Sequence, residues 1–417
     1  MIPVGYVALW IFIFSLPWEG VIVTGGTAVV PRLTGMIAVG SAALAVTLTG
    51  RLRRWHLFHV AALLFVLVAG LNLFFTAPGG HLPAKYYTFV QLFLVLWMIW
   101  EIARTRRAVH GLMLAYVSGA YVAALLTLTV LHSHGTAMRR YVAGDFDPND
   151  LAMTLALAVP MAWYLGTVFQ KPLLRLFCRA YLPLGLLALG LTGSRGGMLT
   201  AGVALMIVPL SMTKLTPGRL IAAMLTLAIT ATVAANYVPE RVVERLATTS
   251  SDISRLSFGG RFKFWVAGLE AFTQKPLMGY GTGGFVRAIY PILGSVSLVA
   301  HNSFISLLVE EGLVGLLLYL TMMLAVLGAV LRLPKFERRF ALLLLATLFV
   351  AMSPLTWEDR KPVWFILAAL LGLSQATLPA RASPQGQVPA SPPAGRPATE
   401  IRQRPGPRPR ASWEARG

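Results

Sequence analysis

Charged residues are scarce in this chain of 417 residues: 12% are Asp, Glu, Lys or Arg, whereas 56% are hydrophobic. Soluble domains carry about 25% charged residues, so this composition excludes a soluble globular protein and predicts a polytopic membrane protein. Cysteine is limited to Cys178, which excludes an internal disulfide and a cysteine-based metal site. A Walker motif is missing, so ATP is not expected to be the energy source.

Acidic residues are especially few, since 16 Asp and Glu stand against 36 Lys and Arg and give a formal net charge of +20. In a soluble protein such an excess would suggest nucleic acid. Here most cations fall in short segments between apolar runs, where membrane topology accounts for them, so no nucleic-acid partner is expected. No pair of carboxylates is clearly set up for glycoside hydrolysis.

Twelve apolar segments are long enough, at about twenty residues, to be read as crossing a bilayer. They lie at 4–23, 32–49, 57–76, 87–103, 109–131, 150–169, 179–193, 197–212, 219–236, 311–331, 339–355 and 362–378. The pair 179–193 and 197–212 is short and closely connected, and could form one tight helical hairpin. The first segment has neither a basic n-region nor a small-residue cleavage signal, so we expect a membrane helix there rather than a signal peptide.

Cations in five short loops indicate the orientation. Fifteen of them lie there: Arg51, Arg53, Arg54, Arg104, Arg106, Arg107, Lys171, Arg175, Arg179, Lys214, Arg219, Arg332, Lys335, Arg338 and Arg339. The positive-inside rule places these loops and both termini in the cytoplasm. The other side then receives 77–86, 132–149, 194–196, 237–300 and 356–361. Few cysteines and many helices favour a bacterial inner membrane, with these segments in the periplasm.

The predicted fold is therefore an all-α polytopic membrane protein of about 12 transmembrane helices with a large helical periplasmic loop. Residues 1–236 would hold nine of the helices, 237–300 the loop subdomain and 301–378 the last three helices. The tail at 379–417 is rich in Pro, Ala and Arg, and we expect a disordered basic cytoplasmic segment. A partner-binding arm is the less favoured alternative for this tail.

The 237–300 stretch points to an anionic ligand, because membrane proteins usually keep this side poor in Lys and Arg. Its seven cations are Arg241, Arg245, Arg255, Arg261, Lys263, Lys275 and Arg287, and its four acids are Glu240, Glu244, Asp252 and Glu270. Arg241, Arg245 and Arg255 are expected to be paired with Glu240, Glu244 and Asp252 or solvated. Arg261 is then the first candidate for the anion and Arg287 the second.

Two arginines stand beside glycines at expected helix starts. Arg195 lies in Thr192–Gly197, where free backbone N–H groups suit an anion; snorkelling to lipid headgroups is the alternative. Arg261 follows two glycines and opens an expected short helix that runs to about Phe272. On that helix Trp265, Leu269 and Phe272 share a face and would meet apolar surroundings, and an interfacial amphipathic helix is the alternative interpretation.

The segment Pro276–Phe285 is rich in glycine but has no Lys-Ser/Thr pair and follows no strand, so it predicts a tight turn and not a nucleotide P-loop. After it, Asn302 or Ser303 can cap a helix. His301 lies just outside that helix at the membrane surface, where an imidazole could transfer a proton. A structural role is the alternative for a lone histidine. Glu310 and Glu311, deeper on the helix, are weak candidates for a buried polar partner.

The 132–149 segment adds weaker candidates. Asn149 is the expected cap of the next helix, and Asp147 or Asn149 could touch a sugar. Arg139 and Arg140 add two outer cations. His132 and His134 lack a convincing third ligand, so no metal site is predicted and a hydrated loop is favoured.

The motifs resemble the O-antigen ligase family, which is related to the O-antigen polymerases. The resemblance rests on Ser194-Arg195-Gly196, Gly260-Arg261 with Trp265, Pro276-Leu277-Met278-Gly279, His301-Asn302-Ser303-Phe304 and Glu311-Gly312-Leu313-Val314-Gly315. It covers about residues 140–330 through these motifs. Each motif is loose alone, but their order, spacing and common side of the membrane make the combination fairly specific.

The resemblance implies a GT-C membrane glycosyltransferase that moves a glycan from undecaprenyl diphosphate to a sugar hydroxyl of lipid A–core. It implies that His301 is the general base, that Arg195 and Arg261 bind the diphosphate, and that no cofactor is needed. An acidic residue of the kind such enzymes often use as base is not evident, which fits His301 in that role. The alternatives are an O-antigen polymerase or protein oligosaccharyltransferase with the same donor, and a lipid-linked glycan transporter.

Overall fold

The structure is a computed structural model. It describes residues 2–24, 27–50, 52–75, 82–211, 236–247, 261–294 and 299–377, with isolated positions between 217 and 232. Residues 1–378 form one unit and 379–417 a second. The predicted tail and most of the predicted span 219–236 lie outside the described residues, as do Asp252 and Arg255.

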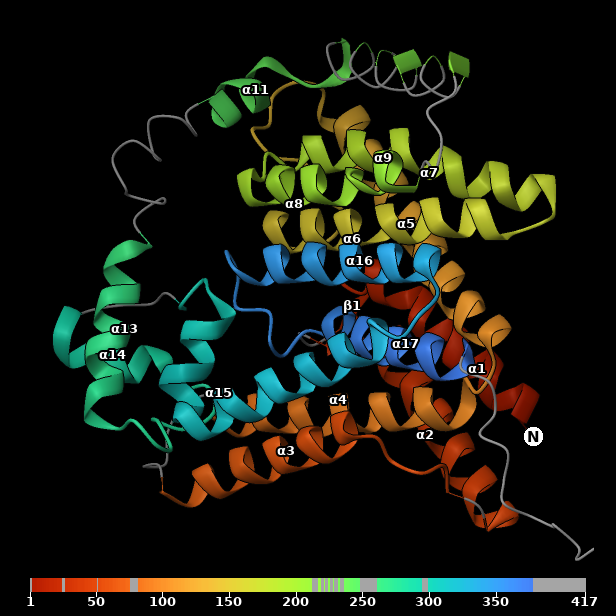
Figure 1. The fold of residues 1–417 in the computed structure, drawn as a ribbon. Helices are drawn as coiled ribbons and strands as arrows, with labels where there is room; N and C mark the ends of the chain where they lie inside the picture. Colours follow the sequence, from red (N-terminus) through yellow and green to blue (C-terminus); the bar gives the residue numbers. More distant parts are fainter. Residues whose placement is uncertain are drawn as a thin grey trace, which may run out of the picture. The chain divides into compact units, whose positions relative to one another are not determined.

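Helices dominate the described part of the chain (Figure 1). They are α1 (Ile2–Ser15), the short 3₁₀ helix η1 (Leu16–Trp18), α2 (Val29–Thr49), α3 (Leu57–Phe75), α4 (Leu82–Ile102), α5 (Arg106–His134), α6 (Pro148–Val168), α7 (Pro172–Leu191), α8 (Arg195–Leu205), α9 (Ile207–Ser211), α11 (Glu240–Ala247), α13 (Phe262–Gln274), α14 (Phe285–Leu293), α15 (Ser303–Val330), α16 (Lys335–Met352) and α17 (Lys361–Thr377). Strands β1 (Val23–Thr24) and β2 (Thr27–Ala28) form a small antiparallel pair.

Six of these helices are long and apolar enough to cross a membrane, namely α2, α3, α5, α6, α7 and α15, and Val4–Trp18 and Arg195–Ser211 are shorter apolar segments. This agrees with an all-helical membrane protein, and the count of twelve spans stays a prediction. Within the apolar window of α6, 83% of the residues are buried in protein, against 17% in α2. Helix α6 therefore lies at the centre of the bundle and α2 at its edge.

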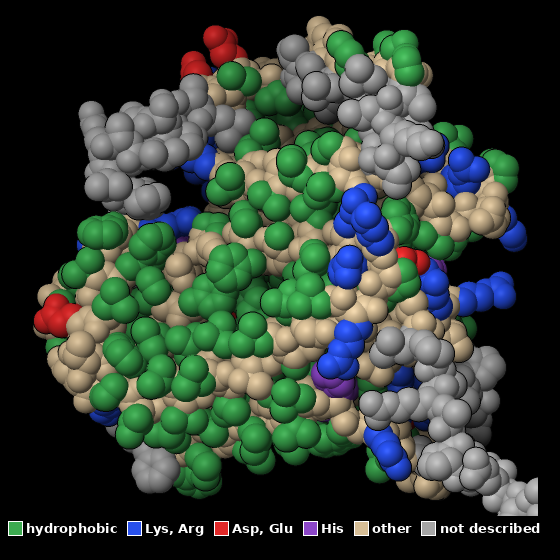
Figure 2. All heavy atoms as spheres, viewed as in Figure 1, with side chains coloured by type: hydrophobic (Ala, Val, Ile, Leu, Met, Phe, Trp, Pro, Cys, Tyr) green, Lys and Arg blue, Asp and Glu red, His purple; other side chains and the backbone are tan. Residues whose placement is uncertain are grey.

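Helix α6 packs on α5, α7, α8 and α16 (Figure 1). Helices α3, α4, α15 and α17 form a second group, in which α15 packs on α3 and α17 packs on α4. Helices α13 and α14 pack on each other and on α15, at the end of the bundle where α15 begins. In Figure 2 apolar side chains cover the middle of the visible face. Lys and Arg gather on the right, at the end of the bundle away from α13 and α14. This distribution is typical of a helical bundle with an apolar belt.

The connection around residue 171 differs from the prediction. Helix α7 begins at Pro172 and has 20 residues, so Arg175 and Arg179 lie in its first turns rather than in a loop. Proline is favoured at the first helical position, because its fixed φ suits a helix and its missing N–H is not needed there. Long arginine side chains at a helix end can reach the membrane surface from this place.

Candidate active site

The site is built around a break in α15. Gly312 has φ +66° and ψ −168° inside this helix, a conformation that favours glycine. The predicted turn at 276–283 docks into the break and replaces the lost helical hydrogen bonds. Tyr280 N donates to Val309 O at 2.9 Å, Gly281 N donates to Glu310 O at 2.7 Å, and Leu313 N donates to Pro276 O at 2.8 Å.

This docking explains the glycines at both contact points. A Cβ on Gly279 would lie 2.5 Å from the carbonyl oxygen of Glu310, and one on Gly312 would lie 2.3 Å from that of Leu277. Two of the sequence motifs, Pro276-Leu277-Met278-Gly279 and Glu311-Gly312-Leu313-Val314-Gly315, thus pack against each other as one unit. The unit fixes where the first turns of α15, and His301 before them, stand relative to α13 and α14.

His301 is held in a strained backbone conformation just before α15. Its φ of +47° is the single positive value of a non-glycine residue in the ranges that the structure describes. Such conformations cost roughly 1–3 kcal/mol and often mark functional positions. The His301 N–H donates to Thr356 Oγ1 at 3.1 Å, while the side chain of Asn302 caps α15 by accepting from Phe304 N and Ile305 N at 3.0 Å each.

The His301 side chain lines a polar cavity of about 560 Å³. Its charged lining residues are Lys85, Asp147, Asp150, Glu310, Asp359 and Arg360. Burial lowers the pKa of His301 below its usual 6.5, and the positive charge of Arg261 lowers it further, while Asp147 opposes both. The imidazole is therefore neutral at pH 7 and able to accept a proton.

The charge of Asp147 acts on three of the predicted residues, His301, Arg261 and Arg140. Burial lowers the pKa of both arginines, to about 10 for Arg140, and the negative charge of Asp147 opposes this shift. Asp147 also caps α6, accepting from Asn149 N at 2.8 Å and Asp150 N at 3.3 Å. The prediction that Asn149 is the cap is wrong, because Pro148 takes the first helical position and leaves Asp147 in the capping place.

Asn149 instead links two loops. Its Oδ1 accepts from Arg140 Nη2 and from Ser194 Oγ, both at 2.9 Å. Ser194 in turn caps α8, so Arg195 is the first residue of that helix, two residues before the predicted start of the span at 197. The segment 192–197 and the segment 139–149 therefore meet at one place.

Arg195 and Arg245 are joined by hydrogen bonds next to the segment 192–197. The guanidinium of Arg195 donates to Arg245 O at 3.2 and 3.3 Å, and Arg245 Nε donates to Gly193 O at 3.2 Å. Arg245 also lowers the pKa of Arg140 by repulsion. Arg241 donates to Ala137 O at 2.7 Å. Arg245 was expected only to pair with an acid or be solvated. It lies beside Arg195 and Arg140, and so adds to this group a cation that the sequence did not single out.

Arg261 stands at the start of α13, as predicted, and its Nη1 donates to Pro354 O at 2.9 Å. The helix runs from Phe262 to Gln274. Its protein-facing residues are Phe264, Ala267, Gly268 and Ala271. Leu269 is 46% exposed and does not pack on protein, so apolar surroundings for Leu269 stay a prediction. Trp265 is half-buried and donates from Nε1 to Ala300 O at 2.9 Å, next to His301.

Two predicted cations, Arg287 and Arg139, are more exposed than Arg140 and Arg261. Arg287 is exposed on α14 and donates from Nη2 to Tyr280 O at 2.6 Å, and it does not line the polar cavity. Arg139 is exposed as well, and the cavity lining does not include it. Their place at the anion site stays a prediction.

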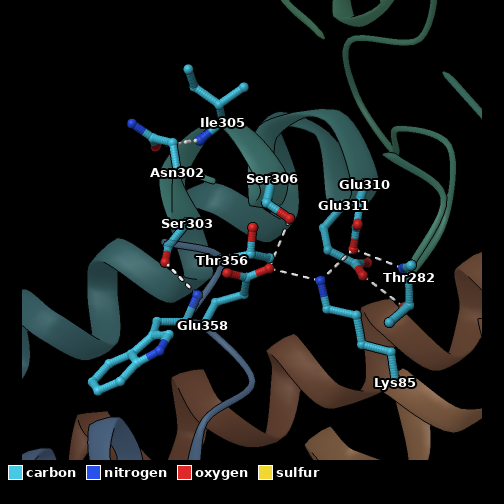
Figure 3. Close-up of polar contacts among 12 residues, drawn as sticks. Lys85, Thr282, Asn302, Ser303, Ile305, Ser306, Glu310, Glu311, Thr356 and Glu358 are labelled. Carbon is cyan, nitrogen blue, oxygen red and sulfur yellow. Dashed lines mark hydrogen bonds and ion pairs between the residues drawn. The ribbon is translucent and has the colours of Figure 1, made fainter. Parts of the chain in front are cut away.

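A buried ion cluster of Lys85, Glu310 and Glu358 lies beside the cavity, which Lys85 and Glu310 line. Figure 3 shows its contacts. Lys85 Nζ lies 2.8 Å from Glu310 Oε2 and 2.7 Å from Glu358 Oε1, and Ser306 Oγ donates to the same Glu358 oxygen at 2.8 Å. Gly283 N donates to Glu310 Oε2 at 2.7 Å. The cluster ties α4, α15 and the loop before α17 together.

Glu311 makes a neighbouring set of contacts. It accepts from Thr282 Oγ1 at 2.6 Å (Figure 3), and it also accepts from Asn72 Nδ2 at 2.9 Å. Glu310 and Glu311 are thus buried polar partners, as the weak prediction had it. Lys85 was not predicted, although a lysine beside an apolar run is a detectable signal of a buried partner.

Arg360 is a further cation that the sequence analysis missed. It forms an ion pair of 3.0 Å with Asp150, which also accepts from Trp357 Nε1 at 2.9 Å. Burial lowers its pKa, but the carboxylates of Asp150 and Asp359 outweigh this and raise the pKa above the ordinary value. Arg360 therefore keeps its charge at the cavity, where an anionic group could meet it.

The arrangement combines a neutral base at the cavity with Lys85 and Arg360 in the cavity lining, and with Arg140 and Arg261 close enough to Asp147 for its charge to act on them. Such a site can accept a proton from a hydroxyl group and can stabilise an anionic leaving group. The group of three or more His, Cys, Asp and Glu that a metal ion would need is not found among the residues with described positions.

Comparison with known proteins supports this chemistry. The model of the family described as O-antigen ligase matches residues 180–320, which include Arg195, Arg261, the turn at 276–283 and His301. No curated protein was found to match the chain. The family match supports glycan transfer of the ligase or polymerase type, and hence an enzyme, and together with the apolar helices it indicates a multi-pass membrane protein. The resemblance to the O-antigen ligase family is therefore confirmed over residues 180–320, about a third of the chain.

Proposed function

We propose that the protein transfers a glycan from undecaprenyl diphosphate to a sugar hydroxyl of lipid A–core at the periplasmic face of a bacterial inner membrane. The observation that carries this proposal is the cavity that His301 and Asp147 line together. Arg140, hydrogen-bonded to Asn149, and Arg261, hydrogen-bonded to Pro354 O, are held near enough for the charge of Asp147 to act on both. In this proposal residues 237–300 face the periplasm between the membrane regions 1–236 and 301–378, and the tail at 379–417 is cytoplasmic.

His301 acts as the general base in this proposal. Its neutral imidazole takes the proton of the acceptor hydroxyl as that oxygen forms the new bond to the anomeric carbon. The bond between that carbon and the phosphate oxygen breaks, and the electron pair leaves with the diphosphate. Because one base activates an acceptor opposite the leaving group, the reaction inverts the anomeric configuration.

The cations bind the diphosphate and stabilise the charge that it gains. Arg261 is the foremost, with Arg195, Arg140 and Arg245 beside it and Arg360 at the cavity. Arginine suits phosphate because its planar fork donates two parallel hydrogen bonds. One preorganised donor at such a place is typically worth about 3–4 kcal/mol in the transition state. No cofactor is required, because the donor is already activated.

Carboxylates at the cavity give a competing base. Asp359 lines the same space as His301 and is half-buried. Asp150 and Glu310 are engaged in ion pairs and are less suited to accept a proton. An Asp359→Asn variant that loses transfer while His301→Gln retains it would move the base to Asp359.

The test uses purified protein, undecaprenyl diphosphate-linked glycan and lipid A–core, with and without chelator. The expected result is glycan coupled to lipid A–core, insensitive to chelator, with inverted anomeric configuration. Longer glycan chains formed without lipid A–core would instead identify a polymerase, and coupling to a peptide acceptor would identify a protein oligosaccharyltransferase. Movement of intact donor across vesicles without any transfer would identify a transporter.

A further inference from the structure

A second cavity, of about 730 Å³, lies beside α1, α2 and α4. Its lining is mostly apolar and includes Phe12 from α1, Met36 and Val39 from α2, and Val95 and Met98 from α4. No step proposed so far uses it. Its size falls in the range of about 300–1,000 Å³ that is usual for one small ligand.

The cavity descends into the apolar part of the bundle. Its lining on α4 runs from Thr88 to Met98. Ten residues of helix span about 15 Å, which is about half of a hydrocarbon core of about 30 Å. The depth suits a single extended hydrocarbon chain better than a polar solute.

The cavity also opens sideways. Met36 and Leu94 line it and are 57% and 37% exposed. Gly40 lines it on α2, and a Cβ built there meets nothing within 4 Å. A hydrocarbon chain could therefore enter from the surrounding lipid without displacing protein atoms.

Positive charge and the polar cavity lie at its outer end. Arg32 in the first turn of α2 and Lys361 at the start of α17 line the apolar cavity, and Lys361 pairs with Glu19 at 2.6 Å. Lys361 follows Arg360, which lines the polar cavity, and Thr88 lines both cavities. A lipid whose anionic head sits in the polar cavity would have its chain beside this opening.

We infer that the apolar cavity between α2 and α4 holds the head-proximal part of the single polyprenyl chain of the diphosphate donor. The inference rests on the proposed function. One chain fits its volume, whereas the acceptor carries several acyl chains. Adjacent cations suit a diphosphate head. The cavity orients the chain rather than driving its burial, since lipid is equally apolar, so it positions the reacting phosphate next to His301.

Photocrosslinking tests occupancy without any glycan transfer. A benzophenone amino acid at Val39 is compared with one at Leu44, which lies on α2, is 51% exposed and does not line the cavity. Irradiation with undecaprenyl diphosphate in phosphatidylglycerol vesicles should give a polyprenyl adduct at position 39 and little at position 44. A phospholipid adduct at position 39 that undecaprenyl diphosphate fails to displace would overturn the inference.

Transfer kinetics test the role of the chain. Gly40→Leu fills the cavity, and Gly328→Leu is the matched control, because a Cβ at Gly328 also meets nothing within 4 Å but lies outside the cavity. Gly40→Leu should raise KM about tenfold for the long-chain donor, since orientation is lost, and leave a donor with a two-isoprene chain unchanged. Equal KM values for Gly40→Leu and wild type would refute the inference, even where His301-dependent transfer shows that the proposed function holds.

Discussion

Removal of the Lys85 ammonium tests the buried ion cluster that supports the cavity wall. In Lys85→Met the carboxylates of Glu310 and Glu358 stay buried but lose a cation that lies within 2.8 Å of both. Breaking a buried pair by removing one partner typically costs about 3–5 kcal/mol, because the remaining charge is uncompensated. We expect the variant to be less stable by at least about 3 kcal/mol.

The assay is thermal unfolding in detergent, followed by tryptophan fluorescence. At roughly 2 °C per kcal/mol for a large chain, the expected loss lowers Tm by at least about 6 °C. Arg104→Met is the control, since Arg104 also pairs with a buried carboxylate but is itself 47% exposed, and exposed pairs contribute about 0–1 kcal/mol. A Lys85→Met Tm equal to that of the control would refute the reasoning.

A second substitution sharpens this test. Burial raises the pKa of Glu358, and Lys85 opposes that shift. Without Lys85 the pKa of Glu358 rises further, and a raised carboxyl pKa destabilises the folded state increasingly as pH rises through that pKa. Lys85→Met should therefore lose most stability at alkaline pH, and Lys85→Met with Glu358→Gln should recover part of it. Absence of recovery at pH 8 would show that the ammonium does not compensate this carboxylate.

Three further predictions concern the site. Arg261→Ala should lower kcat for transfer about 10²–10³-fold with little change in Tm, as expected for one electrostatic donor, and unchanged kcat would remove Arg261 from the diphosphate site. Because burial and Arg261 lower the pKa of His301, the acid limb of kcat/KM should have its midpoint below pH 6.5. Asp147→Asn keeps the helix cap but removes a charge that raises this pKa, so the midpoint should move to still lower pH, and a shift to higher pH would contradict the assignment. Gly312→Ala places a Cβ 2.3 Å from Leu277 O at φ +66°, so both Tm and activity should drop, and a wild-type Tm would show that the break in α15 tolerates a side chain.

Much of the fold could be predicted from apolar run lengths, because a bilayer demands helices of a minimum length. The start of α15 followed from the capping chemistry of Asn302, and the turn at 276–283 followed from its glycines. The break at Gly312 could not be predicted, because a glycine inside an apolar run looks the same whether the helix continues or is interrupted. Only the docked turn at 276–283 shows why the interruption is stable.

The site was partly predictable for a similar reason. Local signals such as a glycine-flanked arginine or a capped helix start singled out Arg195, Arg261 and His301 as candidates, and their roles stay predictions. Lys85 and Arg360 depend on partners more than 200 residues away in sequence, Glu310 for Lys85 and Asp150 for Arg360, and no local pattern shows these partners. Arg287 was a candidate through its nearness in sequence to the motifs, which says little about where a side chain on α14 lies; it is exposed there and does not line the polar cavity.

The most direct test of the central claim is the transfer rate of His301→Ala in the reconstituted reaction with undecaprenyl diphosphate-linked glycan and lipid A–core. General base catalysis typically contributes about 10²–10⁴-fold, so the rate should fall by that factor while Tm stays near that of wild type. The exposed variant Arg287→Ala, tested in parallel, should keep nearly full activity. Full transfer by His301→Ala would contradict the assignment of His301 as the base, and with it the mechanism proposed for this cavity.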